Sequence, residues 1–247
     1  MLSDNNPDLI ACYLAVRDSP GEVIRELSRL AAAHERGGTA HYYAVRNEQF
    51  NPLRAALASS NGRDRRYTAA LAAMFIYLNR TGYNGLFRLN SDGHFNVPAG
   101  RYTRPRICDA MNLQRVAAIF GTPQVTVERA RFDTVADTAR PGDFLYFDPP
   151  YAPVSRTARF TAYTTEGFDA AAQHRLRDVL ITLAARGCQV VMSNSTAPDI
   201  TMLYEECAEV KAAGFMCHRI PARRAINSDA SRRGTVEEYV ITNVPAA

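Results

Sequence analysis

Phe144-Leu145-Tyr146-Phe147-Asp148-Pro149-Pro150-Tyr151 is the stretch around which the rest of the chain is organised. Its four apolar residues follow a turn signal at 141–143 and predict a strand buried on both faces, as found inside parallel sheets. Each proline fixes its own φ, lacks an N–H and holds the preceding residue extended, so the carbonyl oxygens of Asp148 and Pro149 are fixed acceptors. We therefore expect an acid, a rigid carbonyl and an aromatic ring at the carboxyl end of a strand, where open α/β sheets bind ligands.

These groups suit methyl transfer to the exocyclic amine of a nucleobase. The amino nitrogen of adenine or cytosine is a poor nucleophile because its lone pair is delocalised into the ring. If Asp148 and the Pro149 carbonyl each accept one N–H bond, the nitrogen is drawn toward tetrahedral geometry for attack on a sulfonium methyl group. Tyr151 would offer the extruded base a ring on which to stack. An ordinary Asp-Pro turn is the alternative, and the two interpretations carry about equal weight.

Length and composition narrow the class of protein. The 247 residues suffice for one large α/β domain or a domain with an insertion, and 47% of them are hydrophobic, enough for a core. The sequence lacks both an apolar run of about 18 residues and a charged-then-apolar leader, so we expect a soluble cytoplasmic protein. Its five cysteines form no Cys-x-x-Cys pair, which argues against disulfides, a zinc site or any bound metal, and against the zinc-dependent base deaminases.

A basic segment with a hairpin pattern precedes that stretch. Residues 80–106 contain five arginines and one acid, a net charge of +4. Within it, residues 85–98 suggest two short strands around a turn at 90–93. Such a ribbon can enter the major groove, where Leu86 would touch a thymine methyl group and Arg88 would bond guanine, while the other cations face phosphate. A solvated flap with a charged face is the alternative.

The remaining pattern alternates helices and strands, which favours an α/β fold. We expect helices near residues 19–30, 50–57, 67–78, 109–120, 169–183 and 200–203, and further strands near 125–127, 190–192, 215–220 and 238–242. The last two strands would form a closing hairpin that adds an antiparallel strand to a parallel sheet. Asp4 follows a short strand end, where a doubly wound fold places the acid that binds a cofactor ribose. No glycine-rich loop precedes it, however, so the sequence pattern alone favours a simple helix N-cap.

Five blocks in a fixed order resemble the Dam-like family of DNA adenine methyltransferases. They run from Asp4 to about Asn243 and comprise LSDNNPDLI (2–10), LNRTGYNGLFR (78–88), FNVPAGRY (95–102), YFDPPYAP (146–153) and RRAINS (223–228). The second and third blocks are much more specific than the fourth, which other amino-methyltransferases share.

The resemblance implies a doubly wound, mostly parallel sheet with helices on both faces. A helical target-recognition domain with a hairpin at 84–102 would be inserted before the catalytic strand, at residues 21–120, leaving residues 1–20 and 121–247 as the catalytic methyltransferase domain. Family members begin with a Lys-Trp-Ala-Gly-Gly-Lys-like segment and a Phe-x-Gly-x-Gly-like loop, neither of which occurs here. We therefore expect the first strand and the glycine-rich cofactor loop to be missing.

The resemblance also assigns roles to single residues. S-adenosylmethionine would be the methyl donor, with Asp4 on its ribose, Phe132 or Asp133 beside its adenine and Asp148 near the transferred group. Asp148, Pro149 and Tyr151 would bind the flipped adenine, and a loop at 155–163 would close over the site. Double-stranded DNA would be contacted by the exposed residues of the recognition domain, namely Arg80, Tyr83 (a wedge in the base stack), Asn84 (phosphate), Leu86, Arg88 (guanine), Pro98 and Arg101.

The resulting hypothesis is a site-specific DNA adenine methyltransferase, encoded by a bacterium or phage and associated with the nucleoid, with GATC as the expected site. A role in restriction and modification is one expectation. Two alternatives stay open: a catalytically inactive DNA-binding remnant, and one half of a split enzyme whose partner is a separate N-terminal fragment. A methyltransferase acting on RNA or cytosine is disfavoured by the match around Tyr83 and Arg88.

Overall fold

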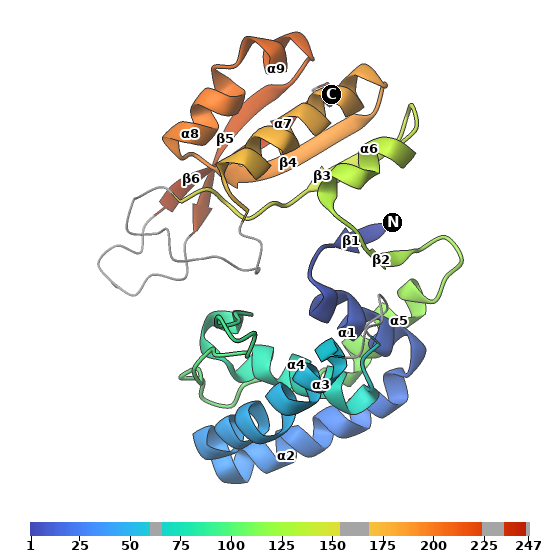
Figure 1. Cartoon of the computed structure of the whole chain (residues 1–247), viewed down its shortest axis with the longest axis vertical. Helices are drawn as coiled ribbons and strands as arrows, with labels where there is room; N and C mark the ends of the chain where they lie inside the picture. Colours follow the sequence, from blue (N-terminus) through green and yellow to red (C-terminus); the bar gives the residue numbers. More distant parts are fainter. Residues whose placement is uncertain (60–65, 154–167, 224–234, 246–247) are drawn as a thin grey trace. The chain divides into compact units, whose positions relative to one another are not determined.

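The computed structural model describes residues 1–59, 66–153, 168–223 and 235–245. The chain divides into two compact units, Met1–Ala130 and Arg131–Ala247, each with a hydrophobic core of its own (Figure 1). Helices and small sheets occur in both units, so the predicted α/β class is confirmed. The predicted closing loop at 155–163 and most of the block at 223–228 lie outside the described residues. Within the described part, none of the helices is both long and apolar enough to cross a membrane.

The first unit is mainly helical. Its helices are α1 (Pro7–Asp18), α2 (Pro20–Ala44), η1 (Val45–Phe50), α3 (Asn51–Ser59), α4 (Ala69–Thr81), η2 (Tyr83–Gly85) and α5 (Ala110–Phe120). As its continuous apolar sequence predicts, α4 is the buried helix of this unit, and its Leu71, Tyr77 and Leu78 are at most 2% exposed. The helix predicted to start at Ser19-Pro20 is also confirmed, although it continues through Gly37-Gly38, where Gly38 has a non-helical φ of 48°.

Two short strands complete the first unit. β1 (Leu2–Asp4) and β2 (Val127–Arg129) pair in parallel, with Asp4 opposite Arg129. The second strand begins two residues later than the sequence pattern predicts. The side chain that caps α1 belongs to Asn6, whose Oδ1 accepts hydrogen bonds from the backbone N–H groups of Asp8 and Leu9. The interpretation of Asp4 as the N-cap is therefore wrong.

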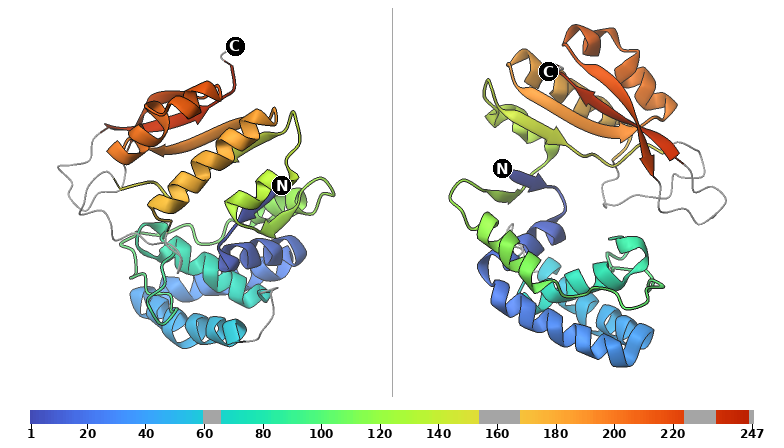
Figure 2. Two further views of the ribbon diagram at one scale, coloured as in Figure 1. Left: turned by 45° about the horizontal axis from the view of Figure 1, so that its top comes forward. Right: turned by 180° about the vertical axis from the view of Figure 1, so that it is seen from behind.

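The second unit contains a four-stranded sheet in the order β3-β4-β6-β5 (Figure 2). Its strands are β3 (Phe144–Phe147), β4 (Gln189–Ser195), β5 (Met216–Arg223) and β6 (Thr235–Thr242), and its helices are η3 (Phe132–Thr134), α6 (Val135–Thr138), α7 (Ala170–Ala185), α8 (Pro198–Ile200), η5 (Thr201–Glu205) and α9 (Ala208–Ala212). β3 and β4 are parallel, whereas β6 is antiparallel to both of its neighbours. The predicted closing hairpin is thus confirmed, and the wider doubly wound sheet stays a prediction.

The two faces of this sheet differ in burial. Val190 and Met192 of β4 are fully buried in a cluster with Leu176 of α7. Phe144 and Tyr146 of β3 lie on the opposite face of the sheet, where they are 62% and 60% exposed. The prediction that β3 is buried on both faces is therefore wrong. Among the described residues β3 pairs with β4 alone, so it is an edge strand.

Residues 82–100 reverse direction as a hairpin, as the sequence predicts. The two arms are joined by isolated antiparallel bridges between Gly82 and Ala99 and between Leu89 and Phe95, and this segment, which the structure describes throughout, forms no regular strand. The backbone N–H of Gly93 donates to Asn90 O at 2.9 Å and closes the turn, where Gly93 adopts a φ of 76°. Glycine is favoured there because a side chain strains a left-handed backbone.

Candidate functional site

The segment Asp148–Tyr151 leaves the carboxyl end of β3 at the surface of the second unit. Asp148 and Pro150 are exposed, and Tyr151 is 37% exposed. β4 runs parallel to β3 with Met192 opposite Phe147, so the residues after Met192 lie at the same edge of the sheet as Asp148–Tyr151. The predicted placement of these groups at the end of a parallel strand is therefore seen in the structure, and they are not packed into the interior.

The carboxylate of Asp148 is oriented by Ser193. The Ser193 hydroxyl donates to Asp148 Oδ1 at 3.0 Å and lies 3.2 Å from the hydroxyl oxygen of Tyr146. Burial raises the pKa of Tyr151 above its ordinary value, and a hydrogen bond with Ser193 partly offsets that increase. Ser193 thus joins the acid to two tyrosines. No described residue donates a hydrogen bond to Asp148 Oδ2, which leaves that oxygen available to a ligand.

Buried amides hold the first part of the loop. Gln173 of α7 donates from Nε2 to the Pro150 carbonyl oxygen at 3.2 Å, and it accepts from Asn194 Nδ2 at 3.2 Å. Gln173 is 7% exposed and Asn194 is fully buried. Because an unsatisfied buried amide is costly, this pair fixes the position of Pro150 relative to α7 and β4.

The far end of the loop is held at Ala152. Its backbone N–H donates to Asn194 Oδ1 at 3.2 Å, and its carbonyl oxygen accepts from Ser195 Oγ at 2.6 Å. In contrast, no described residue donates to the Pro149 carbonyl oxygen. The loop is thus held at Asp148, Pro150 and Ala152, and the Pro149 carbonyl oxygen between these contacts remains available.

Sequence reasoning missed the residues that hold this loop. Ser193, Asn194 and Ser195 follow the apolar segment Val190–Met192 as three consecutive polar residues. A polar run at the carboxyl end of a strand is the signal that could have identified them, because this is the edge where α/β sheets bind ligands. No sequence signal identifies Gln173, because this residue lies on the buried face of an ordinary amphipathic helix.

The predicted cofactor residues are divided between the two units. Asp4 is exposed at the end of β1 in the first unit, and its Oδ1 accepts from the Asn6 backbone N–H at 2.6 Å. In the second unit Asp133 is bound by Arg131 at 2.9 Å, and hydrogen bonds from Arg131 lower the pKa of its carboxyl group. Phe132 is half-buried there.

The predicted DNA-contact residues come together in the first unit. Tyr83 is 41% exposed, and its backbone N–H donates to the Pro98 carbonyl oxygen at 2.8 Å. Asn84 has a φ of 54°, in the left-handed region that is uncommon for residues other than glycine. The side-chain amide of Asn79 donates to the Gly85 carbonyl oxygen and holds this turn. The turn therefore presents Tyr83 in one fixed backbone conformation.

Arg88 is exposed on the hairpin, and its Nε donates to Asn96 Oδ1 at 2.8 Å. This bond orients the guanidinium group while the two terminal nitrogens remain available for a bidentate contact. Pro98 is exposed as well. Leu86 is only partly exposed because it packs against the hydrophobic core, so less of its side chain than expected is available to a partner.

Most arginines of the basic segment have no acidic partner among the residues that the structure describes. Arg106 pairs with Asp109 at 3.1 Å. Arg80, Arg88 and Arg101 are exposed and form no ion pair with any described residue, and the same holds for Arg104. Exposed cations of this kind suit a polyanionic partner, and a solvated charged face stays the alternative.

Comparison with known proteins gives a consistent result. The model of the D12 class N6 adenine-specific DNA methyltransferases matches residues 1–226. Type II methyltransferase M1.LlaDCHI of Lactococcus lactis subsp. cremoris is 35% identical over 244 residues, which cover 98% of this chain and 78% of that protein. Type II methyltransferase M.MjaIII of Methanocaldococcus jannaschii is 36% identical over 249 residues (98% and 79%), and the DNA adenine methylase of Escherichia coli strain K12 is 34% identical over 250 residues (99% and 79%). The chain belongs to the D12 class of N6 adenine-specific DNA methyltransferases.

Proposed function

We propose that this chain transfers a methyl group from S-adenosylmethionine to the exocyclic amine of an adenine extruded from duplex DNA, with GATC as the preferred site. The observation that carries the proposal is the pair of available acceptors, Asp148 Oδ2 and the Pro149 carbonyl oxygen, on a loop held at Asp148, Pro150 and Ala152. Family membership supports the same chemistry.

Two acceptors on consecutive residues match in number the two N–H groups of an exocyclic amine. Asp148 and the Pro149 carbonyl would each accept one of them, which pulls the nitrogen out of conjugation and turns its lone pair toward the methyl group. As the nitrogen becomes positively charged, the Asp148 carboxylate stabilises it and then takes the surplus proton. The ring of Tyr151 would stack on the extruded base and exclude water from one of its faces.

The residues present fit the proposed methyl donor in part. S-adenosylmethionine would supply the methyl group from a sulfonium. The exposed carboxylate of Asp4 suits the two hydroxyls of a ribose, since a carboxylate can accept two such bonds. Asp133 fits less directly because its carboxylate is held by Arg131.

The first unit would bind the DNA. Exposed Arg80 and Arg101 would neutralise phosphates, Asn84 would contact a phosphate from its left-handed turn, and Tyr83 would wedge into the stack. Arg88 would read a guanine by donating from both terminal nitrogens. Recognition of GATC rests on this guanine contact.

Replacing Arg88 by Ala is expected to relax the preference for one base pair. The loss should be about 1 to 3 kcal/mol at that position alone, because a bidentate contact to guanine is removed. The measurement is kcat/KM on a GATC duplex and on duplexes with single substitutions. Arg101→Ala is the matched control, and it should weaken all duplexes about equally and lower the salt dependence of binding. Uniform losses for Arg88→Ala would show that Arg88 contacts only phosphate.

Replacing Ser193 by Ala is expected to lower kcat by about 10- to 100-fold, since it removes a hydrogen bond to the Asp148 carboxylate. KM for DNA should be unchanged because Ser193 lies outside the DNA-contact unit. Single-turnover methyl transfer measures the effect. Ser28→Ala, which removes an exposed hydroxyl of α2, is the control. A Ser193→Ala protein with the wild-type rate would mean that Asp148 needs no orientation by this hydroxyl.

A split enzyme is the second candidate function. The outer edge of β3 and the exposed rings of Phe144 and Tyr146 favour it, because an exposed apolar edge strand invites another strand. The partner would be a separate fragment carrying a strand and a glycine-rich loop. The test measures methyl incorporation by this chain alone and with the N-terminal segment of a relative. Incorporation only with the segment supports the split enzyme, whereas DNA binding without incorporation in either case supports an inactive remnant.

A further inference from the structure

The hairpin that carries Arg88 has little regular structure of its own. Two isolated bridges join its arms, and an isolated two-stranded ribbon is at best marginally stable in water. Base readout nevertheless needs Arg88 within a fraction of an ångström of its position, because bidentate hydrogen bonds are directional. Something outside the hairpin must therefore fix its shape.

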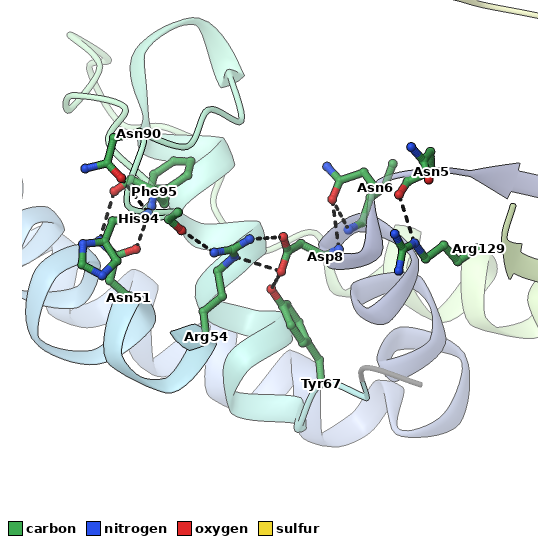
Figure 3. A network of polar contacts seen from close by, with 12 residues as sticks. Asn5, Asn6, Asp8, Asn51, Arg54, Tyr67, Asn90, His94, Phe95 and Arg129 are labelled. Atoms are coloured by element: carbon green, nitrogen blue, oxygen red, sulfur yellow. Dashed lines mark hydrogen bonds and ion pairs between the residues drawn. The ribbon is translucent and has the colours of Figure 1, made fainter. Parts of the chain in front are cut away.

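The side chain of Asn51, at the start of α3, bonds both polar groups of Phe95 (Figure 3). Phe95 N–H donates to Asn51 Oδ1 at 2.9 Å, and Asn51 Nδ2 donates to the Phe95 carbonyl oxygen at 3.1 Å. This is the pattern that a neighbouring β-strand would provide. The phenyl ring of Phe95 is 2% exposed and packs against Phe50 with ring centroids 5.9 Å apart.

Arg54 holds the turn of the same hairpin from one helical turn further along α3. Its Nη1 donates to the carbonyl oxygen of Gly93. Its Nε and Nη2 donate to the two carboxylate oxygens of Asp8 at 3.0 and 2.7 Å, and Tyr67 donates to Asp8 Oδ1 at 2.6 Å (Figure 3). Asp8 and Arg54 are 1% and 7% exposed, so the turn is tied to a buried ion pair between α1 and α3.

The anchored arm leads directly to Arg88. Asn96, the neighbour of Phe95, donates from its backbone N–H to Arg88 O at 3.1 Å, and its side-chain oxygen accepts from Arg88 Nε. A shift of the peptide at Phe95 would therefore be passed through Asn96 to the guanidinium group. Asn51 is 9% exposed, so it is itself screened from DNA.

We propose that Asn51 and Arg54 are positioning residues for base recognition, which fix the hairpin so that Arg88 reads its guanine without contacting DNA themselves. This inference rests on the proposed DNA-methylating function. In this proposal, discrimination between base pairs depends on buried residues of α3, whereas affinity for the DNA phosphates depends on exposed arginines. The proposal also predicts that Asn51 and Arg54, called the anchor residues below, each affect base discrimination through Arg88.

The first measurement needs no DNA. Hydrogen exchange of the amides in residues 86–98 should accelerate at least about tenfold in Asn51→Ala, which removes both bonds to Phe95, because these bonds hold the segment against opening. Arg54→Lys, which keeps a positive charge beside Asp8 but cannot bond Asp8 and Gly93 together, should show the same local effect even if Asn51→Ala fails to fold. Asn112→Ala and Arg25→Lys, the same changes at exposed sites of α5 and α2, should leave exchange at 86–98 unchanged. Wild-type exchange in both anchor variants overturns the proposal.

The second measurement is discrimination between a GATC duplex and duplexes with single substitutions, as ratios of kcat/KM and of Kd. Asn51→Ala and Arg54→Lys should lose about 5- to 150-fold of discrimination at the base pair read by Arg88 and little elsewhere. Each anchor variant combined with Arg88→Ala should discriminate no worse than Arg88→Ala alone. Equal losses on every duplex, or losses that multiply with that of Arg88→Ala, would show a merely structural role and overturn the proposal. If the wild-type protein neither methylates any duplex nor discriminates between duplexes, the proposed function fails. Faster hydrogen exchange in Asn51→Ala and Arg54→Lys would then show only that these residues hold the hairpin in place.

Discussion

Replacing Asp148 by Asn is expected to reduce the rate of methyl transfer to duplex DNA by about 100- to 1,000-fold, the largest catalytic effect of any single substitution in this chain. The amide keeps the size of the carboxyl group but loses its negative charge. It would neither stabilise the positive charge that develops on the amine nor take the surplus proton. DNA affinity should stay near the wild-type value, because the expected phosphate and groove contacts lie in the first unit and the side-chain oxygen of the introduced asparagine can still accept an N–H of the extruded base. The measurement is single-turnover transfer at saturating DNA and donor, with Kd for the same duplex.

Asp199→Asn provides the matched control for this experiment. Asp199 is an exposed carboxylate on α8 in the same unit, and its replacement makes the same chemical change away from the loop. It should retain the wild-type rate. An Asp148→Asn protein with a wild-type rate would remove the carboxylate from the mechanism, and a parallel loss of DNA affinity would assign Asp148 to DNA binding instead.

Replacing Asp8 by Asn is expected to destabilise the fold by about 3 to 5 kcal/mol, because breaking a buried ion pair leaves the Arg54 guanidinium uncompensated. Both side chains are buried, and the two bonds between them are 3.0 and 2.7 Å long. The measurement is the free energy of unfolding from denaturant titration, followed by helical signal. The double substitution Asp8→Leu with Arg54→Met should recover most of the loss, since it removes both charges together.

An exposed ion pair serves as the comparison for the Asp8 experiment. Arg17 and Asp18 lie 2.7 Å apart, and the Asp18 side chain is 44% exposed. Asp18→Asn should therefore change the free energy of unfolding by no more than about 1 kcal/mol. If Asp8→Asn costs no more than Asp18→Asn, the Asp8–Arg54 pair does not support the first unit.

Local signals in the sequence predicted several elements well. The bounds of β3 at Phe144–Phe147 agree with the apolar run, and α7 begins at Ala170, next to the helix start predicted at 169, where Asp169 accepts from the Ala172 backbone N–H. The hairpin turn at 90–93 followed from its Asn, Asp and Gly residues. The signals for these features lie within a few positions of one another, so they can be recognised in the sequence alone.

Features that depend on distant pairing could not be predicted. Ser193 reaches Asp148 only because β4 pairs in parallel with β3 in one register, and 45 positions separate the two residues. Asp8 and Arg54 are 46 positions apart, and nothing in their own neighbourhoods identifies them as partners. The exposure of Phe144 was missed for a related reason, because an apolar run shows that a strand is hydrophobic but not that it lies at an edge.

The atom that receives the methyl group tests the central claim most directly. A duplex containing GATC is incubated with the protein and isotopically labelled S-adenosylmethionine, with the N-terminal segment of a relative present in a parallel reaction. The DNA is then digested to nucleosides, which are separated and identified by mass spectrometry. Two acceptors that grip the amine of an extruded adenine predict N6-methyladenine as the labelled product. Label in a methylcytosine, or no label in DNA from either reaction, would contradict the account.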